Sequence, residues 1–196
     1  TMRASSFQGE IPSKRIYNPI ADDLRPDNTP VDPNKLIFFS SPHKGLKRTL
    51  EVFERFKDFK ELKDMKLYVA NPGYFPDGIA DSGAGSTVSL YSLPHSEVIA
   101  HTRSALGVIH LNNVFPETFG LVHAECNAVG TPFLSSRLGA TPELCDHPAE
   151  LIDVMDNKAV IDRIIQWKTL SRPRVRGQPN FRMSKVLREW KELLSL

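Results

Sequence analysis

The chain has 196 residues and a mass of 22.0 kDa, room for one domain of ordinary size or two small ones. Its 25 basic and 23 acidic residues leave a net charge of +2, which gives no electrostatic reason to expect nucleic acid or an anionic membrane as the main partner. No apolar run approaches the roughly 18 residues of a membrane span, and no basic-then-apolar signal opens the chain. We therefore expect a globular cytoplasmic protein, either free or peripherally attached to a membrane.

Cysteine and histidine spacing does not indicate a metal site. Cys126 and Cys145 form no C-x-x-C pair, and no cysteine and histidine have the spacing of zinc ligands. His123 and Glu125 are two residues apart, so on a helix they point in different directions. We expect reduced thiols, no metal and no bound cofactor.

Apolar runs alternate with segments of helical periodicity from residue 35 onward. Strands are expected over residues 36–39, 66–70, 87–91, 107–111 and 131–135. Helices are expected over residues 45–59, 95–105, 117–129, 159–170 and 183–194, with a surface loop over 72–86. Strands that are apolar throughout and alternate with helices indicate a mainly parallel sheet covered on both faces, which is a doubly wound, Rossmann-like α/β fold.

The two ends of the chain differ from this regular middle part. Five prolines interrupt residues 1–34, which we interpret as an N-terminal segment or an interdomain junction. Residues 35–170 would form the Rossmann-like domain. Residues 171–196 would form a crossover and a C-terminal helix. Three arginines in the crossover indicate a solvated linker more than a nucleic-acid patch.

Ligands of doubly wound folds bind at the carboxyl ends of the strands, so the residues directly after each strand carry the functional information. Lys44 and Gly45 follow the first strand and precede a helix. A lysine at a helix N-terminus suits a phosphate, because the helix adds free N–H groups and positive potential. A surface lysine beside a turn is the alternative.

Two glutamates follow the fourth strand, at positions 117 and 125. Eight residues make about 2.2 helical turns, so both would face the same side, about 12 Å apart along the axis. Carboxylates so far apart cannot act as one acid–base pair, but they could hold two parts of an elongated polar ligand. Alternatively, Glu125 lies on a solvated face and Glu117 only complements the helix dipole.

Residues 108–132, VIHLNNVFPETFGLVHAECNAVGTP, closely resemble the E-x7-E region of retaining GT-B glycosyltransferases of the family 4 type. Further similar segments follow the family's order: residues 15–20 resemble the junction between its two domains, residues 44–46 its K-G-L, and residues 135–144 its G-G-x-x-E segment. The resemblance runs from residue 15 to about residue 170. It implies that this chain is the C-terminal, donor-binding half, that the N-terminal acceptor domain is absent from it, and that its last helix packs against that missing half.

The resemblance also implies roles for three charged side chains. Glu117 corresponds to the glutamate that contacts the transferred sugar, which would make it the catalytic residue. Glu125 corresponds to the glutamate that binds the ribose hydroxyls, and Lys44 to the lysine that binds the diphosphate. Carboxylates accept hydrogen bonds from hydroxyls, and a lysine beside a helix N-terminus neutralises a leaving diphosphate, so no metal is required.

Backbone groups and loops complete the implied donor site. The backbone N–H groups of Phe119, Gly120 and Leu121 would hold the phosphate and the sugar. The nucleobase of the donor would lie near residues 91–94, which include Ser92. The donor would be a UDP- or GDP-linked sugar.

The chain departs from the family pattern in three places. The P-S turn before the first glutamate is Asn112-Asn113, the G-x-G after the second strand is Asn71-Pro72-Gly73, and an arginine is missing. The family has an arginine shortly before the lysine, where this chain has Ser40 and Ser41. His43 could replace it weakly, and Arg48 is poorly placed to do so. These departures concern the affinity for the diphosphate and the identity of the donor.

The resulting hypothesis is the donor-binding domain of a retaining glycosyltransferase. The enzyme would transfer a hexose-type sugar from a nucleotide diphosphate sugar to a hydroxyl of a carbohydrate, lipid or protein acceptor. Two alternatives remain open: a non-catalytic module that binds a nucleotide sugar, and part of a sugar-nucleotide epimerase.

Overall fold

The computed structural model describes residues 13–70, 86–91 and 93–195, and its centre is one parallel five-stranded sheet. The strands are β1 (Asp32–Phe39), β2 (Lys66–Ala70), β3 (Thr87–Tyr91), β4 (Ala105–His110) and β5 (Phe133–Ser135). They lie in the order β3-β2-β1-β4-β5, and each neighbouring pair is parallel. The predicted parallel, Rossmann-like α/β fold is confirmed.

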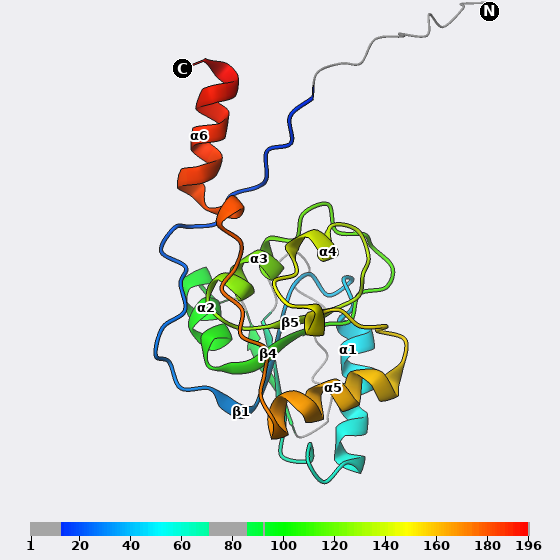
Figure 1. Ribbon diagram of the computed structural model, residues 1–196. Helices are drawn as coiled ribbons and strands as arrows, with labels where there is room; N and C mark the ends of the chain where they lie inside the picture. Colours follow the sequence, from blue (N-terminus) through cyan, green and yellow to red (C-terminus); the bar gives the residue numbers. More distant parts are fainter. Residues whose placement is uncertain (1–12, 71–85, 92, 196) are drawn as a thin grey trace, which may run out of the picture.

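Helices cover both faces of the sheet (Figure 1). The α-helices are α1 (Leu46–Phe53), α2 (His95–Arg103), α3 (Leu121–Ala128), α4 (Thr141–Leu144), α5 (Asn157–Thr169) and α6 (Met183–Leu194). Short 3-10 turns are η1 (Glu54–Asp58), η2 (Pro148–Glu150) and η3 (Pro179–Phe181).

Side chains of the central strand β1 alternate between two separate cores. Leu36 and Phe38 pack with α1 and α5, whereas Ile37 and Phe39 pack with α2 and α3. All four side chains are buried, as expected for a strand enclosed on both faces. This double burial is the physical reason for the continuous apolar run in the sequence.

The helix expected over residues 117–129 begins four residues later, at Leu121. Gly120 precedes it with a φ of 94°, a left-handed conformation that glycine adopts at no steric cost. Glu117 instead forms an isolated parallel bridge with Gly139, and its carbonyl accepts a hydrogen bond of 2.8 Å from Ala140 N. Backbone pairing between two loops therefore positions Glu117, not a helical turn.

Other differences concern the ends and divisions of elements, and β1 begins at Asp32, four residues before the expected strand. The segment expected as one helix over residues 45–59 divides into α1 and η1, and β5 begins two residues later than expected. The two C-terminal helices agree with the expected ranges within about two residues. Apart from residue 86, the loop expected over 72–86 lies outside the described residues.

The N-terminal segment runs beside the C-terminal one, and α6 projects from the sheet domain (Figure 1). Ile20 N donates to Phe181 O at 2.7 Å, and Met183 N donates to Ile20 O at 2.9 Å. Within α6 only Val186 is buried, whereas its other large apolar side chains are exposed. In the part of the chain that the structure describes, no helix is both long and apolar enough to cross a membrane.

Candidate functional site

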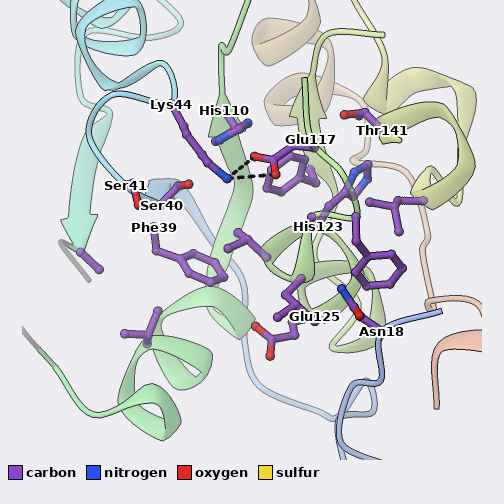
Figure 2. A pocket seen from close by; sticks show the side chains of 18 of the residues that line it. Asn18, Phe39, Ser40, Ser41, Lys44, His110, Glu117, His123, Glu125 and Thr141 are labelled. Carbon is purple, nitrogen blue, oxygen red and sulfur yellow. Dashed lines mark hydrogen bonds and ion pairs between the residues drawn. The ribbon is translucent and has the colours of Figure 1, made fainter. Parts of the chain in front are cut away.

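A cavity of about 600 Å³ opens at the carboxyl ends of β1 and β4 (Figure 2). β2 and β3 extend the sheet on one side of β1, and β4 and β5 extend it on the other side. The cavity thus lies at the topological switch point, where open α/β sheets bind their ligands. Its lining includes Phe39, Ser40, Ser41, Lys44, His95, His110, Glu117, Phe119, Gly120, Leu121, His123, Glu125, Phe133, Thr141 and Leu144.

Lys44 and Glu117 form an ion pair across the cavity. Lys44 Nζ lies 3.0 Å from each carboxylate oxygen of Glu117, as the dashed lines in Figure 2 mark. Both side chains are partly buried. Gly45 brings the loop after β1 against the end of β4: its φ is 96°, and a Cβ there would lie 2.7 Å from Asn112 N. The K-G pair of the sequence therefore has a steric reason as well as a charged side chain.

Glu125 has a different partner at a different part of the cavity. It projects from α3, and its Oε2 lies 3.1 Å from Nε2 of His95, the first residue of α2. Its side chain is only 15% exposed, whereas that of His95 is 61% exposed. Figure 2 shows Glu125 well separated from the Lys44–Glu117 pair. The two carboxylates therefore do not interact and can contact separate parts of one ligand.

The N-terminus of α3 lies between these two acidic side chains in the sequence and contributes to the same cavity. Phe119, Gly120 and Leu121 all line it. The first N–H groups of a helix have no partner within the helix, and the helix dipole adds positive potential there. This end of α3 can accept an anionic group of a ligand.

Two other residues weighed in the sequence analysis, His43 and Arg48, do not line the cavity. The ring of His43 lies edge-on against Phe115, with 5.3 Å between ring centroids. Arg48 turns away and donates two hydrogen bonds, of 3.0 and 2.9 Å, to the carbonyl of Val154. Ser92 lies outside the described residues.

Two buried histidines, His110 and His123, line the cavity although no sequence pattern assigned them to it. Burial lowers the pKa of His110 to about 3, with smaller contributions from His123 and Lys44, so its ring is neutral near pH 7. His123 is 2% exposed and stacks on Phe133, with 4.4 Å between ring centroids. The available signal was a polar residue within each of two apolar segments, β4 and α3.

The chemistry of the cavity suits a polar ligand with hydroxyl and phosphate groups. Ionised carboxylates are acceptors for hydroxyls, and a lysine with a helix N-terminus can neutralise phosphate. Among the described residues, no group of three or more His, Cys, Asp or Glu side chains is arranged to hold a metal ion.

Comparison with known proteins identifies similar structures but no similar sequences. No protein-family model matches the chain, and no curated protein sequence matches it significantly. The pneumococcal O-GlcNAc transferase GtfA, solved with UDP and GlcNAc, aligns over 89% of this chain with a TM-score of 0.67 and 14% identity. TarM aligns over 93% with a TM-score of 0.65 and 14% identity. AviGT4, a glycosyltransferase of avilamycin A biosynthesis, aligns over 91% with a TM-score of 0.59 and 17% identity.

These alignments cover only part of each similar protein. The chain spans 38% of the GtfA and TarM chains and 58% of the AviGT4 chain. At such low identity the similarity establishes the fold, which is the Rossmann-like fold found within these GT-B glycosyltransferases.

Proposed function

We propose that this chain is the donor-binding domain of a retaining glycosyltransferase and that the acceptor domain lies outside it. The observation that carries the proposal is one cavity holding two separate carboxylates, Glu117 and Glu125, together with Lys44 and the N-terminus of α3. The position of the cavity at the switch point and the shared fold with glycosyltransferases support it.

The proposed donor spans the cavity as a nucleotide diphosphate sugar. Its ribose hydroxyls donate to Glu125, whose carboxylate lies near the start of α2. Its diphosphate contacts Lys44 and the first N–H groups of α3. Its sugar lies at Glu117. Because Lys44 already pairs with Glu117, the diphosphate must share or replace that contact when it binds.

In the proposed reaction, the acceptor hydroxyl attacks the anomeric carbon on the face from which the diphosphate leaves. The bond from the anomeric carbon to the diphosphate oxygen breaks, and a bond to the acceptor oxygen forms with the same anomeric configuration. The acceptor proton leaves with the departing diphosphate. Lys44 and the N-terminus of α3 stabilise the charge that develops on that leaving group, and Glu117 orients the sugar.

Calorimetric titration tests the donor site directly. UDP, GDP and ADP, with UDP-N-acetylglucosamine, UDP-glucose and GDP-mannose, would be titrated into the wild-type chain. Glu125→Gln and Lys44→Ala would be titrated beside two matched controls, Glu97→Gln on α2 and Lys47→Ala on α1, both at exposed positions.

The expected result is micromolar to millimolar binding of one nucleotide class. Both site variants should weaken it at least about tenfold, since each loses a charge-assisted interaction, and the two controls should not. Absence of binding by any nucleotide, or equal effects of site variants and controls, would refute the donor site. In a full-length protein, Glu117→Ala should abolish transfer while nucleotide binding largely survives.

A further inference from the structure

We propose that His123 binds a hydroxyl or amide N–H group of the donor sugar through Nδ1, and that Glu150 positions the ring. This assignment rests on the proposed function and specifies how the same cavity distinguishes a nucleotide sugar from the free nucleotide.

The first observation is that the ring nitrogens of His123 make no hydrogen bond to any described residue although the side chain is almost completely buried. Buried polar atoms are nearly always hydrogen-bonded, and leaving one unsatisfied is costly. His123 also lines the cavity, and Figure 2 shows its ring among the cavity side chains. A ligand group in the cavity would supply the missing hydrogen-bond partner.

The second observation is the anion behind the ring. Glu150 is completely buried, and its Oε1 lies 3.7 Å from His123 Nε2. Its carboxylate accepts four hydrogen bonds of 2.8–3.1 Å, from Phe133 N, Asp146 N, His147 N and Asn127 Nδ2. Burial raises the pKa of Glu150, but His123 and the backbone N–H donors outweigh this and lower it below its usual value. Glu150 therefore remains ionised and fixed in place.

The carboxylate beside Nε2 determines which ring nitrogen of His123 carries the proton in the proposed complex. A negative charge near Nε2 favours the tautomer with its proton on Nε2, which leaves a lone pair on Nδ1. Nε2 is directed toward Glu150, which does not line the cavity, so Nδ1 is the ring nitrogen available to a ligand. Stacking on Phe133 holds the ring in this orientation.

An acceptor at Nδ1 matches a sugar and not a diphosphate. Phosphate oxygens have no proton to donate at their ionised positions, whereas sugar hydroxyls and an acetamido N–H are donors. The ribose hydroxyls are assigned to Glu125, which projects from the same helix two residues later and therefore in another direction. The apolar side chains of Phe133 and Leu144 line the same cavity and suit the carbon skeleton of a sugar ring.

Three substitutions at position 123 separate the two ring nitrogens. His123→Phe keeps an aromatic ring on Phe133 but removes both nitrogens. His123→Asn keeps a polar atom near the Nδ1 position, and His123→Gln keeps one near the Nε2 position. The affinities of UDP, UDP-N-acetylglucosamine, UDP-glucose, GDP and GDP-mannose would be measured by calorimetry for all four proteins, and folding checked by circular dichroism.

We expect His123→Phe to weaken the preferred nucleotide sugar about threefold to tenfold, the effect of one lost hydrogen bond, and to leave the free nucleotide unchanged. His123→Asn should restore the sugar affinity and His123→Gln should not. Equal losses for nucleotide and nucleotide sugar, or no loss for either, would overturn the assignment. If the wild-type chain binds the free nucleotide as tightly as the nucleotide sugar, or more tightly, this inference is overturned but the proposed function is not. A wild-type chain that binds no nucleotide would refute the proposed function together with this inference.

The positioning role of Glu150 has its own spectroscopic test. Nitrogen-15 chemical shifts of His123 should report the Nε2–H tautomer in the wild-type chain and a mixture in Glu150→Gln. The same variant should lose part of the sugar preference without losing nucleotide affinity. An unchanged tautomer in a folded Glu150→Gln protein would refute this role for the carboxylate.

Discussion

The buried ring of His110 should make the stability of this protein depend on pH. In the folded chain, burial lowers the pKa of His110 to about 3, from its ordinary value of 6.5. Between these two values the unfolded chain binds a proton at this residue and the folded chain does not. Stability therefore falls as pH decreases below about 6.5, and this contribution levels off below about pH 3.

The size of the effect follows from the pKa difference. Each pH unit between the two values corresponds to about 1.36 kcal/mol at full proton uptake. Lowering the pH from 7.5 to 5 should therefore decrease the free energy of unfolding by about 2 kcal/mol through His110 alone. This is a large part of the total stability of a typical domain, about 5–15 kcal/mol.

Urea unfolding followed by circular dichroism at a series of pH values would measure this contribution. His110→Phe keeps a ring between Phe38 and Phe133, which the native imidazole contacts at centroid distances of 5.9 and 5.2 Å. His110→Gln removes the ring but also does not titrate. Other titrating groups affect all three proteins alike, so the difference between wild type and each variant isolates residue 110.

Both variants should gain about 2 kcal/mol relative to wild type between pH 7.5 and pH 5, whatever their difference at pH 7.5. A difference that stays constant over this range would refute the reasoning, because it would mean that the folded chain also protonates residue 110. If the pH dependence of stability changes in only one of the two variants, the cause is the packing at residue 110 and not its titration.

Three further predictions concern packing and charge. Gly139→Ala would place a Cβ 2.4 Å from the carbonyl oxygen of Glu117 at a φ of 66°, so it should lower stability by at least about 1–3 kcal/mol in urea unfolding and weaken donor binding in calorimetry; unchanged values of both would contradict the bridge. Glu150→Gln should lower the free energy of unfolding by at least about 2 kcal/mol at pH 7, because it removes a buried anion that accepts four hydrogen bonds. Since the folded pKa of Glu150 is lowered, its contribution is present above the unfolded pKa near 4.5 and disappears as pH falls through the folded value, so wild type and variant should converge on acidification; a constant difference would count against this. Arg48→Lys should cost about 1–2 kcal/mol in urea unfolding, because the forked contact with Val154 O is lost, and should leave nucleotide affinity unchanged; weaker nucleotide binding would mean that Arg48 serves the site after all.

The order of secondary-structure elements and the fold class were predictable from local patterns. Strands buried on both faces must be apolar throughout, and the apolar residues of the helices between them must repeat about every 3.6 residues. Both patterns are visible in the sequence. The placement of candidate residues after strands was predictable for the same reason, since parallel strands present their carboxyl ends at one edge. The sequence alone therefore predicts that Lys44, Glu117 and Glu125 lie at a common edge of the sheet.

The contacts within the site depended on residues that are far apart in the sequence. The Lys44–Glu117 pair joins positions 73 residues apart, and Glu117 is held by Gly139 from a third segment, which no local periodicity can indicate.

The burial of ionisable groups was likewise a tertiary effect. Glu150 follows Pro-Ala in a segment of polar composition, and only the packing of β5, α3 and the loop before η2 encloses it. His110 and His123 become cavity residues because the sheet and α3 bring Phe133 between them. Local patterns in the sequence were sufficient to predict which elements form and at which edge of the sheet the candidate residues lie. The pairing of Lys44 with Glu117, and the lack of a hydrogen-bond partner for the ring nitrogens of His123 among the described residues, could not be predicted. These features depend on contacts between distant segments, which no local pattern contains.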